Sequence, residues 1–114
     1  MGTLFYGTQA REIVIEDRLL AHLEVAMLSK MRRREPFALS WLEPDDEERG
    51  LRQAVWVSDA TELVFVYSSP GMPTLNRAWI EALAIGADKG NLHLRPEPVK
   101  DEPSRQAQDL IAIP

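Results

Sequence analysis

The segment DRLLAHLEVAMLSKMRRR (residues 17–34) has the clearest periodic pattern in the chain and determines how its surroundings are interpreted. Its apolar residues recur at steps of three and four, which is the spacing of one face of an α-helix. The stripe consists of Leu20, Leu23, Met27 and Met31. An apolar arc of this width predicts a helix that packs against a sheet.

The two ends of this segment carry helix-terminal signals. Asp17 is the predicted N-cap, because its carboxylate can accept a hydrogen bond from a free N–H of the first turn. At the other end, positive charge suits the unpaired carbonyls of the last turn, and Pro36 prevents continuation. The helix is therefore predicted to stop by about Glu35. The basic residues at that end are Lys30, Arg32, Arg33 and Arg34.

Length and composition predict one small domain. The chain has 114 residues, with 45% hydrophobic and 27% charged residues, which is ordinary for a globular protein. It contains no cysteine, which excludes disulfides, a thiolate nucleophile, zinc ribbons and iron–sulfur centres. No apolar run approaches the roughly 18 residues of a membrane span, and the sequence MGTLFYGTQ lacks the features of a signal peptide. We therefore expect a cytoplasmic protein with no membrane partner.

Six short segments have the composition of β-strands, and one further segment that of a helix. The strands are expected at residues 4–6, 12–16, 37–41, 54–58, 63–68 and 92–95. The second helix is expected at residues 75–90, with Thr74 as its N-cap and Gly90 as its stop. Its expected buried face includes Leu75, Trp79 and Leu83.

The order of these elements, β-β-α-β-β-β-α-β, predicts an α+β fold. Segments 4–6 and 12–16 form a hairpin, and 54–58 pairs with 63–68, either as a second hairpin or in a meander with 37–41. We expect a single curved antiparallel sheet with both helices packed on one face. The domain is predicted to span residues 1–95, followed by a proline-rich, extended C-terminal tail at residues 96–114.

Four stretches of the sequence resemble a family of small actinobacterial proteins, and the likeness covers about residues 1–98. These stretches are DRLLAHL, KMRRREPFALSW, PTLNRAWIEAL and LHLRPEP. Family members share the patterns D-R-x-L-A-H-L, K-L-R-R-G-E-x-F, L-N-x-x-W-I-x-x-L and L-x-P-E-P. This chain departs from them at Arg34, where a glycine is usual, and in a longer acidic loop.

Members of that family are often labelled ATP-dependent DNA ligase, so the resemblance implies an association with nucleic acid. The residues do not support ligase activity, because a nucleotidyl-transferring ligase requires a lysine in a K-x-D-G setting and a far larger adenylation domain. None of Lys30, Lys89 and Lys100 is followed by such a motif. The label is better explained by a neighbouring or fused domain, or by propagation of an error.

Two groups of residues are candidates for ligand binding. The first is the basic cluster Arg32, Arg33 and Arg34, which offers positive charge for a polyanion. The second is Asn76 and Arg77 at the start of the second helix, where free N–H groups attract anions. The favoured alternative for Arg77 is an ion pair with Glu81, one turn later.

Other polar and aromatic residues have structural explanations that we favour. His22 lies away from the apolar stripe and is expected at the surface or at a subunit interface, while Glu24 is expected at the helix edge, reaching solvent. The three tryptophans, Trp41, Trp56 and Trp79, are expected to pack in the core or an interface. The acidic run at residues 43–50 is expected to be a solvated loop, and SSPGMP at residues 68–73 lacks the lysine of a phosphate loop.

The sequence contains no catalytic motif, no metal-binding set and no cofactor fingerprint, so two hypotheses remain. The first is a non-catalytic interaction module that binds a protein partner or a second copy of itself through an apolar patch or an edge strand. The second is a nucleic-acid or nucleotide accessory domain that uses the basic cluster. The net charge of −5 does not favour the second.

Overall fold

The computed structural model describes residues 1–44 and 50–99. The expected acidic loop falls mainly on residues 45–49, and most of the expected tail falls on residues 100–114, so both lie outside the described residues. The elements are β1 (Gly2–Tyr6), β2 (Arg11–Ile15), α1 (Asp17–Arg32), β3 (Phe37–Pro44), β4 (Gly50–Val57), β5 (Leu63–Val66), α2 (Arg77–Asp88) and β6 (Asn91–His93). The predicted α+β class and order of elements are confirmed.

The strands form two three-stranded sheets instead of the single sheet expected. One sheet has the order β2-β1-β5 and is antiparallel throughout. The other has the order β4-β3-β6, in which β6 runs parallel to β3. The prediction was wrong because β5 does not pair with its sequence neighbour β4; it crosses to the free side of β1, where Phe65 lies opposite Leu4.

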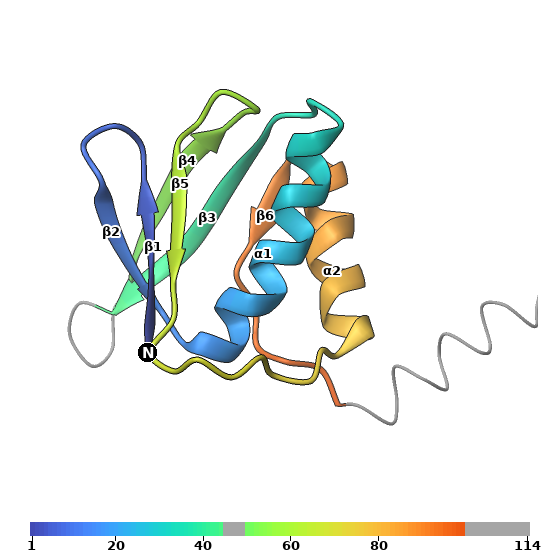
Figure 1. Cartoon of the computed structure of the whole chain (residues 1–114). Coiled ribbons are helices and arrows are strands. Elements are labelled where there is room, and N and C mark those ends of the chain that lie inside the picture. The colour runs from blue at the N-terminus through green and yellow to red at the C-terminus, as the bar shows by residue number, and fades with distance from the viewer. Residues whose placement is uncertain (45–49, 100–114) are drawn as a thin grey trace, which may run out of the picture.

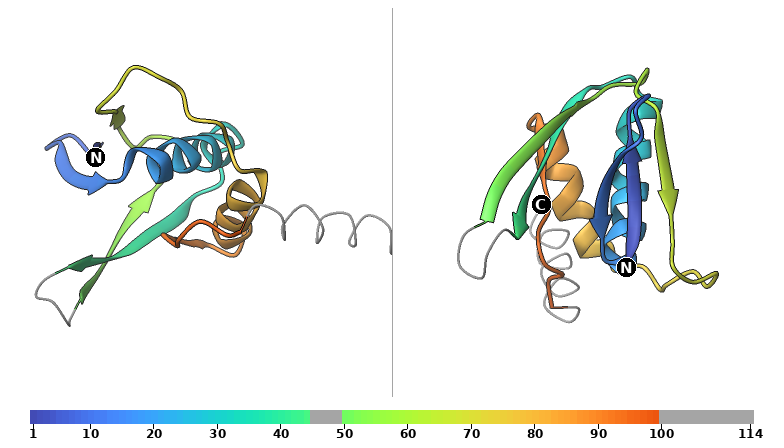
Figure 2. Two further views of the ribbon diagram at one scale, coloured as in Figure 1. Left: turned by 90° about the horizontal axis from the view of Figure 1, so that it is seen from below. Right: turned by 90° about the vertical axis from the view of Figure 1, so that its left-hand side faces the viewer.

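The two sheets meet at one end and spread apart at the other (Figure 2). They approach each other where β4 leads into β5, and there the hydroxyl of Tyr6 donates a hydrogen bond to the carbonyl of Trp56. Arg11 of β2 also donates to Gln53 of β4 and lies 5.8 Å from the ring centre of Trp41. The helices lie side by side to the right of β1–β5 in Figure 1, with β6 beside them.

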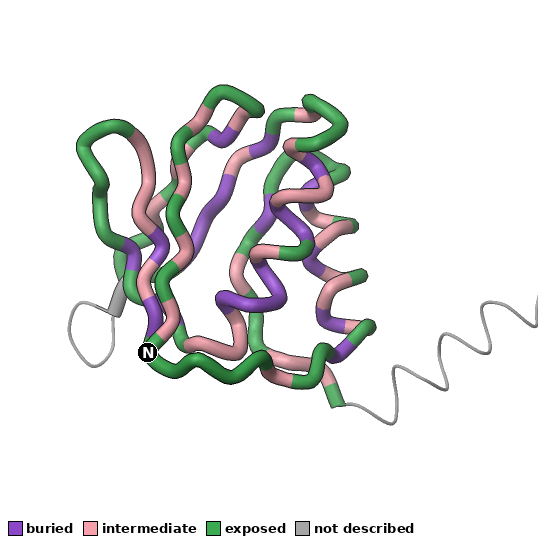
Figure 3. The backbone as a smooth tube through the Cα atoms, in the orientation of Figure 1, coloured by how far each residue is buried: buried purple, intermediate pink, exposed green. Residues whose placement is uncertain are grey.

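One hydrophobic cluster joins both sheets and both helices. Figure 3 shows buried residues on both sheets and both helices, and the buried apolar ones form this cluster. Its fully buried side chains include Leu4 of β1, Leu20, Leu23 and Met27 of α1, Phe37 and Leu39 of β3, and Leu92 of β6. The predicted apolar stripe of α1 is therefore in the core.

Helix α1 begins differently from the prediction, which named Asp17 as the N-cap. The N-cap is Glu16, whose side chain makes no capping hydrogen bond. Asp17 is the first helical residue, and its carboxylate instead accepts hydrogen bonds from the backbone N–H and the hydroxyl of Ser68. Asp17 therefore ties the start of α1 to the segment that follows β5. The pKa of its carboxyl is lowered by the hydrogen bond from the Ser68 side chain.

Helix α2 also begins later than predicted. Asn76, not Thr74, is its N-cap, and the Asn76 Oδ1 accepts a hydrogen bond from the N–H of Ala78 at 3.1 Å. Leu75, expected on the buried face, precedes the helix and is exposed, whereas Trp79 and Leu83 are buried. Gly90 follows the helix with a φ of +97°, a conformation that favours glycine, so the predicted stop is confirmed.

The packed part of the chain continues past residue 95, because Glu97 contacts α1 and Pro98 contacts Asn76. No helix in residues 1–44 and 50–99 has the length and apolar character required to cross a membrane.

Candidate functional site

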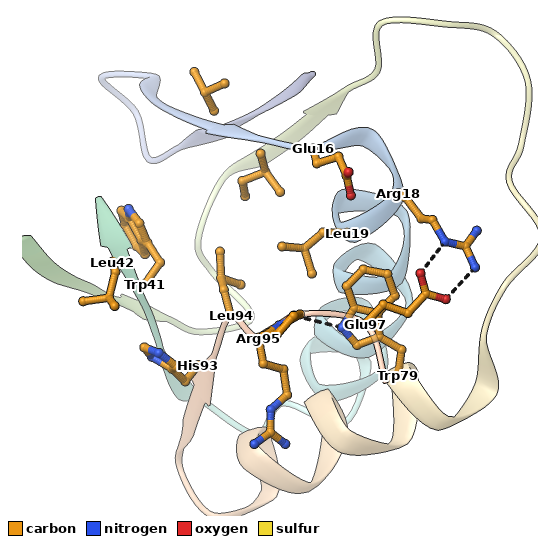
Figure 4. A pocket seen from close by; sticks show the side chains of 13 residues that line it. Glu16, Arg18, Leu19, Trp41, Leu42, Trp79, His93, Leu94, Arg95 and Glu97 are labelled. Atoms are coloured by element: carbon orange, nitrogen blue, oxygen red, sulfur yellow. Dashed lines mark hydrogen bonds and ion pairs between the residues drawn. The ribbon is translucent and has the colours of Figure 1, made fainter. Parts of the chain in front are cut away.

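A cavity of about 580 Å³ lies between the two sheets at the end where they spread apart (Figure 4). Four parts of the chain form its walls: the junction of β2 with α1, the end of β3, the first turn of α2, and the extended segment that begins in β6. Its apolar lining consists of Val14, Ile15, Leu19, Trp41, Leu42, Trp79, Leu94 and Pro96. The cavity is thus mainly an aliphatic and aromatic space.

The polar residues that line the cavity are largely engaged within the protein. The indole N–H of Trp79 donates to the carbonyl of Arg95 at 3.1 Å. The Nδ1 atom of His93 lies 2.9 Å from the hydroxyl of Ser40, and that hydroxyl donates to the Asn91 side chain. Arg18 and Glu97 are also paired with each other, whereas Glu16 and Arg95 contribute charged side chains to the lining. The walls therefore offer an occupant mainly apolar contact together with these two charges.

One wall is fastened by four polar residues that we call the clamp: Arg18, His22, Asn76 and Glu97. Arg18 Nε and Nη2 donate to the two carboxylate oxygens of Glu97, each at 2.8 Å, and Arg18 Nη1 donates to the carbonyl of Thr74 at 2.7 Å. Asn76 Nδ2 donates to Glu97 Oε2 at 2.9 Å. The clamp therefore joins the start of α1, the start of α2 and the segment after β6.

His22 lies at the centre of the clamp. It is fully buried, with Nδ1 2.7 Å from the carbonyl of Arg18 and Nε2 accepting the backbone N–H of Asn76 at 2.7 Å. Its ring is 4.5 Å from that of Trp79. The expectation of a histidine at the surface or at a subunit interface was wrong, because α2 and the residues before it bury His22 within the chain itself.

The charges of the clamp stabilise each other. The hydrogen bond from Arg18, followed by the one from Asn76, lowers the pKa of the Glu97 carboxyl to about 2. The hydrogen bond to Glu97 in turn raises the pKa of Arg18 above its ordinary value. Both side chains are about one-quarter exposed, so the pair sits at the edge of the cavity and not deep in the core.

The buried polar groups of the clamp and its surroundings are satisfied by bonds within the protein. Every buried side-chain nitrogen or oxygen in the described residues has a hydrogen-bond partner. Within the same residues, no group of three potential ligands could hold a metal ion. Ser40 and His93 are in contact, but Ser40 is fully buried, and its hydroxyl donates a hydrogen bond to the Asn91 side chain. Ser40 is therefore not placed as a nucleophile.

The residues predicted as a ligand site do not come together in one place. Arg32, Arg33 and Arg34 follow one another at the C-terminal end of α1, whereas Asn76 and Arg77 stand at the start of α2, at the opposite end of the helix pair (Figure 1). Several of these cations also have carboxylate neighbours. Arg33 lies 3.7 Å from Glu35 and 3.8 Å from Asp88, Arg34 lies 3.7 Å from Asp59, and Arg77 lies 3.7 Å from Glu81.

The remaining predictions about single residues have mixed outcomes. Trp41 and Trp79 are buried as expected, but Trp56 is 58% exposed on β4. Glu24 is partly buried at the helix edge and accepts a hydrogen bond from the hydroxyl of Tyr67 at 2.6 Å. Burial is the main reason that the pKa of Tyr67 is raised above its ordinary value.

Sequence reasoning missed Arg18 and Glu97 as members of the site. A signal was nevertheless present, because Arg18, His22, Asn76, Trp79 and Glu97 all belong to the short stretches that carry the family resemblance. These stretches are far apart in the chain, and the fold brings them together around one wall of the cavity.

The fold and the cavity define a small α+β domain with an apolar space between two sheets. The chain belongs to a family described as a domain of unknown function, DUF7882, which matches residues 1–97. No curated protein and no solved structure matches the chain.

Proposed function

We propose that this domain is a non-catalytic interaction module that binds an extended, apolar segment of a partner protein between its two sheets. The observation that carries the proposal is the position of the cavity, which lies directly beside an edge strand. Residues Val14 and Ile15 of β2, with Glu16 after them, form one of its walls.

The edge of β2 supplies the backbone part of such an interaction. In the described part of the chain β2 is the outer strand of its sheet, with β1 on one side. Alternate residues of an edge strand direct their N–H and C=O groups outward, where an extended segment can pair with them. A partner strand at this edge would send every second side chain toward the cavity.

The walls supply the apolar part. Val14 is 58% exposed and Leu42 is 60% exposed, and both line the cavity. Complete burial of a fully exposed apolar side chain of this size contributes roughly 1.5–3 kcal/mol, so covering these partly exposed residues contributes a part of that. The preferred partner therefore has large apolar residues at alternate positions, with no charge among those that enter the cavity.

Selection of displayed random peptides on the purified protein tests this proposal. We expect enrichment of peptides with apolar residues at alternate positions. Their binding, measured by fluorescence polarisation, is expected to weaken at least about tenfold, or about 1.4 kcal/mol, in Val14→Asp and Leu42→Asp. Both positions are exposed at the rim of the cavity, so a charge can be added there without disturbing the core.

The chain offers a matched control for each variant. Val64 is a valine of the same sheet with 56% exposure, and Leu51 is a leucine of β4 with 56% exposure; neither lines the cavity. Val64→Asp and Leu51→Asp are expected to bind like the parent protein. Equal loss in all four variants, or peptides with no apolar pattern, would refute the assignment of the site.

A second copy of this chain is one candidate partner, as the sequence suggested. Size-exclusion chromatography with light scattering tests this directly. Self-association through the same site predicts a dimer that Val14→Asp dissociates and Val64→Asp does not. A monomer at all concentrations would leave a different protein as the partner.

Nucleic-acid association is the second candidate, supported by the exposure of Arg32, Arg33 and Arg34 and by the ligase label of the actinobacterial family that the chain resembles. The nearby carboxylates and the net charge of −5 oppose it. Titrations of labelled DNA and RNA at low and moderate salt separate the two, because phosphate contacts are strongly salt-dependent. We place either activity in the cytoplasm, which fractionation of the native host checks.

A further inference from the structure

The hydrogen bonds of His22 fix where its proton is. The backbone N–H of Asn76 can only donate, so Nε2 of His22 accepts with its lone pair at 2.7 Å. The ring proton is then on Nδ1, which donates to the carbonyl of Arg18 at 2.7 Å. His22 is therefore neutral in this arrangement, and both of its nitrogens are used.

A second proton on His22 cannot be accommodated in the same geometry. It would place an N–H on Nε2, pointing at the N–H of Asn76, and the bond between them would be lost. Both groups are buried, with Asn76 6% exposed and His22 fully enclosed, so water cannot replace the bond without movement.

The charged groups around His22 do not relieve this conflict. Arg18 on α1 adds a positive charge, and Glu97, after β6, adds a negative charge that is already engaged by Arg18 and Asn76. On the α2 side the ring faces Asn76 and Trp79, which are neutral. A shift of Glu97 toward a protonated His22 would break its bonds to Arg18.

Loss of the bond between His22 and Asn76 would also displace residues that form the cavity wall. Asn76 caps α2 through the N–H of Ala78 and holds Glu97 through its Nδ2 atom. Trp79, in the first turn of α2, lines the cavity, and its ring contacts that of His22 in a tilted arrangement at 4.5 Å. The start of α2, the position of Trp79 and the segment at Glu97 therefore depend on one neutral imidazole.

We propose that His22 is a proton-sensitive latch: its protonation releases Asn76 and opens the wall of the cavity formed by Trp79 and Glu97. The consequence for partner binding rests on the proposed function of the cavity, whereas the release of the wall does not. Such a domain binds its partner when His22 is neutral and releases the partner when His22 is protonated at lower pH.

Nuclear magnetic resonance of the full chain, from about pH 8 to about pH 5, tests the latch in the range where histidines titrate. We expect the Nδ1–H tautomer of His22 at the upper end. On acidification, the His22 ring, the Asn76 amide and the Trp79 indole are expected to shift together in one transition. Protonation of His22 with the Asn76 amide unchanged would overturn the proposal, as would global unfolding with His22 still neutral.

His22→Gln is the matched variant, because a glutamine side chain can accept from the Asn76 N–H but does not titrate. The displayed peptides are expected to bind the parent protein about tenfold more weakly after acidification, within the usual range of coupling between sites, and to bind His22→Gln equally throughout. The same pH dependence in both proteins would exclude the latch. If the selection yields no peptides, the resonances of the parent protein still decide whether the wall opens, so the two proposals fail separately.

Discussion

Glu97 is the residue on which the wall of the cavity most directly depends, because its carboxylate joins two helices to the segment after β6. Arg18 and Asn76 both donate to it, and each comes from a different part of the chain. Residues 94–97 follow β6 and belong to no helix or strand. Beyond the backbone bond from Leu94 to Ser40, hydrogen bonds from the side chains of Trp79, Arg18 and Asn76 hold this segment in place.

Glu97→Gln is expected to lower the free energy of unfolding by about 1–2 kcal/mol at neutral pH, since hydrogen bonds to charged groups contribute about 1.5–3 kcal/mol and this pair is partly exposed. Urea unfolding followed by tryptophan fluorescence measures the change. Glu81→Gln, which removes an exposed ion pair at 3.7 Å, is the control and is expected to change little.

The ion pair between Arg18 and Glu97 also makes the free energy of unfolding depend on pH, in a direction that can be predicted. The pKa of Glu97 is about 2 in the fold against an ordinary value of 4.5, so the unfolded chain takes up this proton first. Stabilisation by Glu97 is complete above about pH 4.5 and is lost as the pH falls toward about 2. The difference in stability between the parent protein and Glu97→Gln is expected to narrow over that interval; a constant difference would contradict the assignment.

Residue 2 must be a glycine, because the fold leaves no room for a side chain at this position. A methyl group at this position would lie 2.7 Å from the carbonyl oxygen of Val66 and 2.8 Å from a methyl of Leu20. Gly2→Ala is expected to destabilise the domain by about 1–3 kcal/mol, as overpacked cores do. Gly71→Ala is the control, because nothing lies within 4 Å of the added atom. Thermal unfolding by circular dichroism compares them, and equal melting temperatures would contradict this packing.

Single residues also show where sequence reasoning reaches its limit. Periodicity located Leu20, Leu23 and Met27 in the core, because the stripe of a helix depends only on local spacing. It misplaced His22 and could not indicate the burial of Lys30, which is 5% exposed. Both lie on the flank of α1 that α2 covers, and the position of a second helix is not encoded in the period of the first.

At the scale of elements, the ends of the two helices are joined by a lysine that is almost completely buried. Lys30 of α1 donates to Glu35 at 2.9 Å and to Asp88, the last residue of α2, at 3.1 Å. The bond to Glu35 is the main reason that the pKa of Lys30 is raised and that of Glu35 lowered. Lys30 therefore fixes the C-terminal ends of α1 and α2 against each other.

Lys30→Ala is expected to destabilise the domain by about 2–4 kcal/mol, because it removes charge-assisted bonds and the packing of a buried stem. Lys89→Ala is the control: Lys89 is an exposed lysine immediately after α2. Urea midpoints of the two variants give the comparison. If Lys30→Ala were as stable as Lys89→Ala, the contact between the helix ends would not depend on this lysine.

The order of elements was predictable because each carries its own local pattern, but the pairing of strands was not. The segment between β4 and β5 is short and has the composition of a hairpin turn, yet β5 leaves its neighbour and joins β1. An alternating apolar strand fits either sheet edge equally well. Which strand β5 pairs with depends on the three-dimensional position of the core, and that position cannot be read from a single sequence.

For the whole molecule, the decisive feature is that two sheets share one core. Residues from both sheets and both helices belong to a single hydrophobic cluster, so neither sheet has a core of its own. Domains of this size with one core generally unfold in one cooperative step. The cavity lies at the edge of that cluster, where the spread of the sheets leaves it open.

Tryptophan fluorescence reports on Trp41 and Trp79 at the cavity and on Trp56 of β4, whereas far-ultraviolet circular dichroism reports on all elements. We therefore expect the two signals to give the same urea midpoint. A ligand of the cavity is expected to raise both midpoints together. Separate midpoints would indicate that one sheet unfolds without the other and would contradict a shared core.

The parallel pairing of β6 with β3 has a consequence for how the protein is made. Ser40 and His93, which meet across this pairing, are 53 positions apart in sequence. Closure of so long a loop costs entropy before any contact compensates for it, so chains with distant pairings fold slowly. During synthesis on a ribosome, the second sheet stays incomplete until nearly all of residues 1–98 have emerged. A nascent chain stalled before Leu92 would thus present an unfinished edge of β3 to chaperones, and that edge is covered only once β6 has emerged.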